Sequence, residues 1–255
     1  MLRFTTFNIR NGEAKDGMNS WENRRESVVR LIREIDPDII GLQEVLQDQL
    51  FYLVAQLPNY NYVGVAREDG EQLGEYAPIL FKKDRIKSLD HQTFWLSETP
   101  EVVGSGSWDT ACVRICTSAR LSAAGREINI FNCHLDHVSE MARSGGMSVI
   151  IQKLQSPAIV MGDFNASELE TGAFGLAYAG LADTFRMAHP KDHEVGTFNN
   201  FDTSHMEGDK IDYIFATSDF RVHSSRIDRT SYEGRAVSDH FPVVADLELE
   251  IPEPF

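Results

Sequence analysis

Apolar and polar residues follow one another along this chain in short blocks whose spacing predicts strands alternating with helices. The run Leu2–Asn8 is rich in β-forming residues and ends on a polar residue. From Ser20 to Ile35, apolar residues recur at helical spacing with arginines on the other faces, and Asp36-Pro37 stops this helix. The same patterns predict further strands at Asp38–Leu42, Tyr60–Ala66, Tyr76–Phe81, Ile86–Trp95, Cys112–Leu121, Glu127–His134, Ala158–Gly162, Ile211–Ala216, Phe220–Thr230 and Val243–Leu249. They predict further helices at Leu46–Leu57, Val138–Leu154 and Gly172–Ala179.

The predicted strands outnumber the predicted helices, and no low-complexity linker separates them. This balance favours an α/β fold with two packed sheets over a simple doubly wound sheet. We therefore expect a single domain that spans residues 1–255. The longest irregular stretches fall at Arg67–Glu75, Ser97–Asp109, Lys191–Asp209 and Ser231–Ser238, and loops of this length in a compact domain are often functional.

Composition supports a folded domain with a large core, since 42% of the residues are hydrophobic and 25% are charged. No apolar run is long enough to predict a transmembrane helix, and the N-terminus lacks the apolar segment of a secretory signal. We therefore expect a cytoplasmic protein. The three cysteines form no CxxC pair, so neither a disulfide framework nor a zinc site is predicted.

The formal net charge of −15 limits the partners that this surface can bind. Tight binding to nucleic acid depends on Lys and Arg side chains that displace counterions from the phosphates. Long nucleic acid is thus an unfavourable partner, whereas a small phosphorylated substrate remains possible. The sequence leaves the oligomeric state open.

Polar residues stand at the ends of successive predicted strands. A single Asp or Asn in such a place is usually a turn former or a helix cap. Strand ends at one edge of a sheet lie close together, so a whole set of acids, amides and imidazoles there predicts a shared cleft. The set comprises Asn8, Glu44, His134, Asp163 with Asn165, Asp212, and Asp239 with His240.

Two segments of this set carry the clearest chemistry. In Gly162-Asp163-Phe164-Asn165, side chains that alternate along an extended chain place Asp163 and Asn165 on one side. In Ser238-Asp239-His240, a carboxylate able to bind metal lies beside an imidazole that titrates near neutrality. His134 adds a second imidazole at a strand end.

Five segments together resemble the signature set of the endonuclease/exonuclease/phosphatase superfamily, in the order of that family and across nearly the whole chain. They are Thr6-Phe7-Asn8-Ile9-Arg10, Leu42-Gln43-Glu44, Gly162-Asp163-Phe164-Asn165, Ile211-Asp212-Tyr213-Ile214-Phe215 and Ser238-Asp239-His240. Further segments resemble a bacterial subgroup of metal-dependent hydrolases: Gly74–Phe81, Phe94–Pro100, Ser107-Trp108-Asp109 and His134–His137. The resemblance implies a four-layered α/β sandwich with two packed mixed β-sheets, as in the pancreatic-type deoxyribonucleases, and an active site at one edge of the sheets.

The resemblance also implies a divalent metal. Glu44 and Asp239 would ligate the ion, and Asn8 would ligate it through water or hold the phosphate. Hard oxygen ligands of this kind suit Mg²⁺ or Mn²⁺.

The remaining roles follow from the same match. Asp163 would orient or deprotonate the attacking water, and Asn165 would hold a non-bridging oxygen. His240 would contact the scissile phosphate, and Asp212 would orient it from behind. His134 would flank the phosphate opposite His240. We expect Glu75 either to orient His134 or to be a solvated acid of an acidic loop.

The predicted reaction is hydrolysis of a phosphate ester, a phosphodiester or phosphomonoester, by in-line attack of a metal-assisted water. A nuclease acting on DNA or RNA is the alternative among enzymes, and the acidic surface counts against it. A catalytically silent binding protein with the same fold is the alternative of another class, and the complete set of site residues counts against that.

Overall fold

The computed structural model describes residues 1–204 and 206–250 of the chain. Its strands are β1 (Leu2–Asn8), β2 (Ile39–Gln43), β3 (Tyr60–Val63), β4 (Ile79–Lys82), β5 (Ile86–Trp95), β6 (Ile115–Ala123), β7 (Arg126–His134), β8 (Ala158–Asp163), β9 (Leu181–Asp183), β10 (Asp212–Thr217), β11 (Phe220–Ile227), β12 (Ser231–Tyr232), β13 (Arg235–Ala236) and β14 (Val243–Leu249). Its helices are the 3₁₀ helix η1 (Gly17–Asn19) and the α-helices α1 (Trp21–Ile35), α2 (Gln47–Gln56), α3 (Glu140–Gln152), α4 (Glu168–Ala173) and α5 (Thr184–Ala188).

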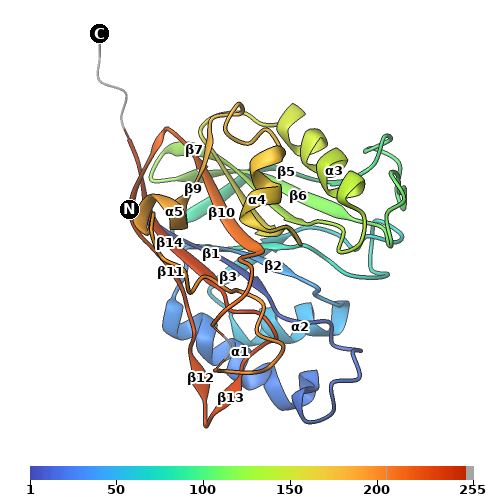
Figure 1. Ribbon diagram of the computed structural model, residues 1–255, viewed down its shortest axis with the longest axis vertical. Helices are drawn as coiled ribbons and strands as arrows, with labels where there is room; N and C mark the ends of the chain where they lie inside the picture. The colour runs from blue at the N-terminus through green and yellow to red at the C-terminus, as the bar shows by residue number, and fades with distance from the viewer. Residues whose placement is uncertain (205, 251–255) are drawn as a thin grey trace.

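Two six-stranded sheets lie face to face at the centre of the molecule (Figure 1). The first has the order β11-β14-β1-β2-β4-β3 and the second the order β5-β6-β7-β8-β10-β9. Each sheet is mixed, because β1 runs parallel to β2 but antiparallel to β14, and β7 runs parallel to β8 but antiparallel to β6. Helices α1 and α2 cover the outer face of the first sheet, and α3 covers that of the second (Figure 1). The four-layered sandwich with two packed mixed sheets is therefore confirmed.

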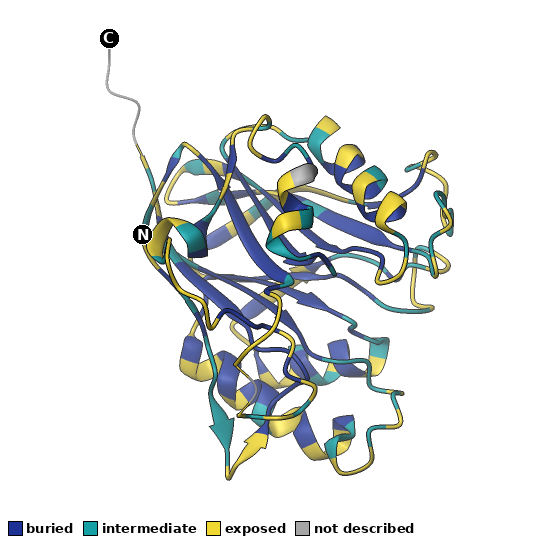
Figure 2. Ribbon diagram, viewed as in Figure 1, coloured by how far each residue is buried: buried dark blue, intermediate teal, exposed yellow. Residues whose placement is uncertain are grey.

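The alternation of side chains along β1 shows how these layers arise. Phe4 points into the apolar layer between the sheets, whereas Phe7 packs with Val28 and Ile32 of α1. Every second residue of a strand faces the same side, so Asn8 lies on the inner side with Phe4. Figure 2 shows the strands of both sheets as the most buried part of the molecule. The polar end of β1 thus emerges at the edge of the inter-sheet core.

A buried pair of amides joins the two sheets behind this edge. Gln43 at the end of β2 donates from Nε2 to Asn132 Oδ1 of β7 over 2.6 Å. Asn132 Nδ2 in turn donates to the carbonyl oxygens of Leu42 and Pro78 over 2.8 and 2.9 Å. A Cβ on Gly41 would come within 2.6 Å of the Asn132 amide, so glycine makes room for the bridge.

Most predicted elements are confirmed, with ends that shift by a few residues. The helix predicted at Gly172–Ala179 is wrong: α4 ends at Ala173 and begins at Glu168, because Ser167 caps it by accepting from the Glu170 N–H. The elements that periodicity misses are η1, β9, α5, β12 and β13, all too short to show a period. The three cysteines are free thiols. Within the described residues, no helix is long and apolar enough to span a bilayer.

Replacing Asn132 with Ala removes the amide bridge and with it three buried hydrogen bonds, although the Gln43 amide keeps Thr6 Oγ1 and Pro78 O keeps the Leu42 N–H. Since each unmade buried hydrogen bond costs about 1–3 kcal/mol, we expect a loss of about 3 kcal/mol in the free energy of unfolding. Urea titration measures it. Asn129→Ala on the same strand is the control, because Asn129 bonds to Gln155 near the surface and its loss should cost less than about 1 kcal/mol. Equal losses in the two variants would contradict a special role for the bridge.

Candidate active site

The polar strand ends converge on one cleft of about 530 Å³ at the edge shared by the two sheets. Most of the predicted site residues line it: Glu44, Glu75, His134, Asp163, Asn165, Asp239 and His240. The other two, Asn8 and Asp212, are fully buried behind the lining and bond to it. The expected convergence is therefore observed.

Strand order explains why residues far apart in sequence meet here. His134 ends β7 and pairs with Asp163, which ends the parallel strand β8. Asp212 opens β10, and because β10 runs antiparallel to β8, its first residue lies opposite Asp163. Parallel neighbours thus contribute their last residues and the antiparallel neighbour its first. An imidazole and two carboxylates consequently stand side by side along one edge.

Gly162 is essential to the side-by-side placement of His134 and Asp163. Its φ of 151° is a conformation that residues with a side chain rarely adopt, and a Cβ there would overlap the backbone carbonyl oxygen of Cys133. The close approach of β7 and β8 that places His134 next to Asp163 therefore requires glycine at this position.

His240 and Asp212 form a buried dyad. His240 Nδ1 and Asp212 Oδ2 are 2.8 Å apart, and neither side chain is more than 5% exposed. Burial alone would lower the pKa of His240, but the Asp212 and Asp163 carboxylates outweigh it and raise the pKa well above its ordinary value. Since Nδ1 contacts Asp212, Nε2 is the ring atom left to face the cleft. The dyad therefore presents a cationic N–H donor.

Asp163 lies at the centre of the site. Its Oδ2 accepts from Asn8 Nδ2 over 3.0 Å and lies 3.5 Å from His134 Nε2 and 3.8 Å from His240 Nε2. Its Oδ1 accepts from the Asn165 backbone N–H over 2.9 Å. Burial, and then the charge of Asp212, raise the pKa of Asp163 to about 7. A carboxylate so poised can accept a proton near neutral pH.

Glu44 and Asp239 supply further carboxylates on the side of the first sheet. Continued alternation after β2 would turn Glu44 toward the helices, but its φ of 61° directs the carboxylate back to Asn8 Nδ2 at 3.0 Å and Asn11 N at 2.8 Å. Burial raises the pKa of Asp239, and the nearby charge of Glu44 adds to the effect. A divalent cation relieves crowding of this kind. The carboxylates of Glu44 and Asp239 therefore fit a hard metal ion, while Asn8 presents its Nδ2 to Glu44 and its Oδ1 accepts from the Arg10 N–H.

Two other groups of described residues bring possible ligand atoms within 4.8 Å of one another, and in the one formed by Cys112, Asp136 and His137 the Asp136 oxygens and His137 Nδ1 are already hydrogen-bonded. In the other group, Asp163, Asp212 and His240 each place one donor atom within 4.8 Å of the others. The His240–Asp212 hydrogen bond already occupies this pair. The group at Glu44 and Asp239 is therefore the better match for a resident ion.

Glu75 does not orient His134. Its two oxygens accept from Asn11 Nδ2 over 2.8 Å and from Arg67 Nη1 over 2.5 Å. His134 Nδ1 is buried and has no hydrogen-bond partner within residues 1–204 and 206–250. Burial, together with the charges of Arg114 and Arg67, keeps the pKa of His134 well below its ordinary value. His134 is thus a neutral imidazole, and Glu75 belongs to a network with Arg67.

Several lining residues were assigned no role from the sequence: Arg10, Asn11, Arg67, Arg114 and Phe198. Arg10 ends the family-like segment Thr6–Arg10 and Asn11 comes directly after it, so that segment was the available signal for both. Arg67 opens one of the long loops. Arg114 lies in an apolar stretch and Phe198 in an irregular one, and neither has a distinguishing pattern around it.

Asp136 fixes the loop that carries His137 into the cleft. Its Oδ1 accepts from the N–H groups of Val138 and Ser139 over 2.9 and 2.7 Å, at the start of α3. Its Oδ2 accepts from Thr110 Oγ1 and Ala111 N over 2.9 and 3.0 Å. Although burial opposes it, these hydrogen bonds lower the pKa of Asp136 to about 2. The carboxylate therefore ties the segment before β6 to α3.

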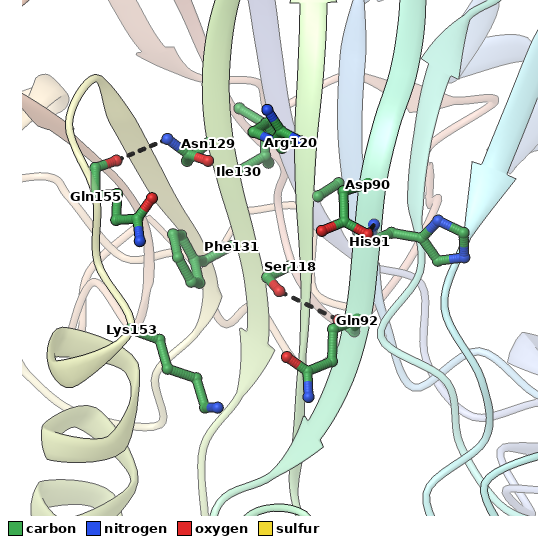
Figure 3. Close-up of a pocket in the computed structure, with 11 residues that line it drawn as sticks. Asp90, His91, Gln92, Ser118, Arg120, Asn129, Ile130, Phe131, Lys153 and Gln155 are labelled. Atoms are coloured by element: carbon green, nitrogen blue, oxygen red, sulfur yellow. Dashed lines mark hydrogen bonds between the residues drawn. The ribbon is translucent and has the colours of Figure 1, made fainter.

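A second pocket, of about 290 Å³, lies on the outer face of β5, β6 and β7 (Figure 3). Its cationic side chains Arg120 and Lys153 pair with Glu127 and Glu101. Ser118 and Asn129 bond to backbone carbonyl oxygens of Gln92 and Gln155, as the dashed lines show. Its one acid and one imidazole, Asp90 and His91, are exposed neighbours on β5, whereas several buried acids and imidazoles meet at the sheet edge, so we assign function to the cleft.

The sequence profile of the endonuclease/exonuclease/phosphatase family matches residues 5–240. The chain belongs to this family. Members of the family are phosphoesterases, typically dependent on a divalent metal.

Solved structures and curated relatives agree with this assignment. A family protein from Bacteroides vulgatus is 38% identical, with a TM-score of 0.89 over 98% of this chain and 99% of that one. A mannosyl-6-phosphatase from Bacteroides thetaiotaomicron is 31% identical, with a TM-score of 0.89 over 98% of this chain and 100% of that one. Nocturnin from Drosophila melanogaster is 26% identical over 91% of this chain and 43% of its own length. The chain spans between 43% and 60% of the curated relatives that it matches.

Replacing Asp136 with Asn tests the tie between α3 and the segment before β6. The pKa of Asp136 is about 2 in the folded protein, against about 3.9 for an unfolded chain, so its ionised form stabilises the fold above pH 4. We expect Asp136→Asn to lower the free energy of unfolding by about 2 kcal/mol at pH 7. Urea titrations from pH 7 to pH 2 should show the difference shrinking as the pH falls through 4 toward 2. A difference that is independent of pH would contradict the ionic origin.

Proposed function

We propose that the protein is a divalent-metal-dependent phosphoesterase that hydrolyses a phosphate ester of a small or short substrate by in-line attack of water. The observation that carries the proposal is the position of Asp163. It is a buried carboxylate flanked by the Nε2 atoms of His134 and His240 and bonded to Asn8, and its pKa is about 7. A base poised near the operating pH is what activation of a water requires.

The chain's own residues divide the reaction between them. Asp163 orients the attacking water and accepts its proton. His240, held by Asp212, donates a hydrogen bond to the charge that develops on the phosphoryl oxygens. The neutral His134 flanks the phosphate from the other side. Asn165 is anchored by its Nδ2 donation to Leu135 O over 3.0 Å, and this fixes its amide to hold a non-bridging oxygen.

Glu44 and Asp239 would hold the metal ion, and Asn8 would orient Glu44. Once bound, Mg²⁺ or Mn²⁺ supplies positive charge to the phosphoryl oxygens and helps the leaving oxygen depart. Glu44 keeps one hydrogen bond on each oxygen, to Asn8 and to Asn11, and these bonds orient both oxygens while lone pairs remain for the ion.

Two observations support a small substrate. The net charge of −15 opposes a long polyanion, whereas a cleft of about 530 Å³ is in the range of small-molecule sites. The similarity to a mannosyl-6-phosphatase adds support for a phosphorylated small molecule, and a sugar phosphate is a suitable first substrate.

Removal of the His240 imidazole or of the Asp163 carboxylate should nearly abolish turnover. We expect His240→Asn and Asp163→Asn to lower kcat about 1,000-fold on p-nitrophenyl phosphate or sugar phosphates, because each removes a proton-transfer or charge-stabilising group. Phosphate release in the presence of Mg²⁺ or Mn²⁺ measures it. The matched controls are His223→Asn and Asp90→Asn, whose parent residues do not line the cleft, and these should leave kcat within about twofold.

The substrate panel also decides between the candidate functions. Cleavage of single-stranded DNA or RNA that is much faster than cleavage of small esters would replace this proposal with a nuclease. Equal inactivity of the wild type and of His240→Asn across all substrates and both metals would favour a silent binding protein.

Metal binding has a readout that is independent of turnover. An ion that binds only the folded state raises its stability by about 2.7 kcal/mol at 100 times its Kd. We expect Mg²⁺ or Mn²⁺ to raise the Tm of the wild type and to have little effect on Glu44→Gln. Glu127→Gln removes the same charge from an exposed ion pair and should keep the full shift. A shift of equal size in Glu44→Gln would exclude Glu44 as a ligand.

A further inference from the structure

Arg114 is a buried cation in the wall of the cleft. It directly precedes β6 and lines the cleft together with His134 and His137, on the side contributed by the second sheet. Its side chain is only 6% exposed. Its charge helps to lower the pKa of His134, so the two side chains lie close enough to interact. A guanidinium so deeply placed normally has its N–H groups paired.

The hydrogen bonds of Arg114 are incomplete. Nη2 lies 2.9 Å from His137 Nδ1, whereas Nε is buried and has no partner in the described part of the chain. The ion-pair partner Asp136 stands 3.8 Å from Nε, and the oxygens of that carboxylate already accept four other hydrogen bonds. Arg114 therefore keeps donor capacity that the described residues do not use.

The other two arginines that line the cleft already form hydrogen bonds to carboxylates. Arg10 makes two hydrogen bonds to the Asp16 carboxylate, at 3.0 and 3.1 Å. Arg67 donates to Glu75 over 2.5 Å and to Glu68 over 3.3 Å. Of these three arginines, Arg114 is the one that makes no hydrogen bond to a carboxylate of the described residues.

His137 extends the donor surface. A guanidinium can only donate, so His137 Nδ1 must accept from Arg114, and the ring proton is then on Nε2. His137 is exposed and lines the cleft. The pair therefore offers donors from both side chains, next to the neutral imidazole of His134.

We propose that Arg114, supported by His137, binds a non-bridging oxygen of the phosphoryl group and selects dianionic phosphomonoesters over monoanionic phosphodiesters. This inference rests on the proposed phosphoesterase function. A monoester has three terminal oxygens and, with a second pKa near 6, carries almost two negative charges at pH 7. The metal side and the His240–Asn165 side serve two of these oxygens, and Arg114 serves the third. A diester has an alkyl or aryl group in that place and leaves the guanidinium without its anion.

Two substrates with the same leaving group test the proposal. We expect Arg114→Gln to lower kcat/KM for p-nitrophenyl phosphate by about 10- to 100-fold, the range of a lost charge-assisted hydrogen bond, and for methyl p-nitrophenyl phosphate by less than about threefold. Arg114→Lys keeps the charge without the planar fork and should recover part of the loss on the monoester. Arg120→Gln removes an exposed guanidinium from β6 and should change neither value.

A loss of equal size on both esters would overturn the proposal and make Arg114 a structural residue of the Asp136 loop. A loss confined to bisphosphates, with p-nitrophenyl phosphate unchanged, would overturn the assignment to the transferred phosphoryl group. Calorimetric titration with inorganic phosphate and Mg²⁺ gives a second measurement, in which Arg114→Gln and Arg114→Lys should bind more weakly than Arg120→Gln. If the wild type cleaves neither ester, the proposed function fails. Phosphate binding then still decides the subsite, since unchanged affinity in both Arg114 variants would refute it.

Discussion

The buried hydrogen bond between Gln43 and Asn132 fixes how the two sheets face each other. Apolar contacts fill most of the layer between the sheets, but they are non-directional and do not set the position of one strand end against another. An amide pair in that layer does, since a displaced sheet would leave its donors and acceptors unpaired. Gln43 pairs with Asn8 in the β1–β2 ladder, and Asn132 lies two residues before His134 on β7. The bridge therefore sets the separation between the two halves of the cleft.

Behind this edge the fold concentrates charge that it does not fully compensate. Asp163, Asp212 and Asp239 are all buried, and such groups are stable only when paired or solvated by fixed dipoles. The charge of His240 neutralises Asp212 and offsets part of the charge of Asp163. On the side of the first sheet, the carboxylates of Glu44 and Asp239 repel each other. A cation at this place completes the balance. The opposite wall contains the buried cation Arg114, whose Nε stands 3.8 Å from Asp136 and makes no hydrogen bond to the described residues. One wall of the cleft thus has excess negative charge and the other has a cation with a free donor. This arrangement suits a metal ion bound at the first wall and a phosphoryl group between the two walls.

The sequence predicted the layers, the strand ends and the convergence of the acids and imidazoles, because these depend on alternation and on short segments with few conformations. It did not predict α4 correctly, since the choice of Ser167 as the cap is made by the local hydrogen bond and not by apolar spacing. It also misplaced the partner of Glu75. The family resemblance offered His134 as one of two alternatives, but the loop that carries Glu75 folds so that the carboxylate meets Arg67 and Asn11. Contacts between two irregular segments have no periodic signal, so they become visible only in the structure.

The wall of the cleft also combines residues placed by strand register with residues placed by irregular segments. His134, Asp163 and Asp212 lie at the ends of strands β7, β8 and β10, where register dictates their positions. Two other residues of the cleft wall, Arg114 and Phe198, lie in segments between strands. Phe198 is 42% exposed and its ring meets His240 edge-on at 5.2 Å, so it borders the opening beside the dyad. Segments of this kind can change without disturbing the register of the strands. The register of the strands therefore fixes the positions of His134, Asp163 and Asp212, whereas the side chains on the connecting segments can vary without disturbing them.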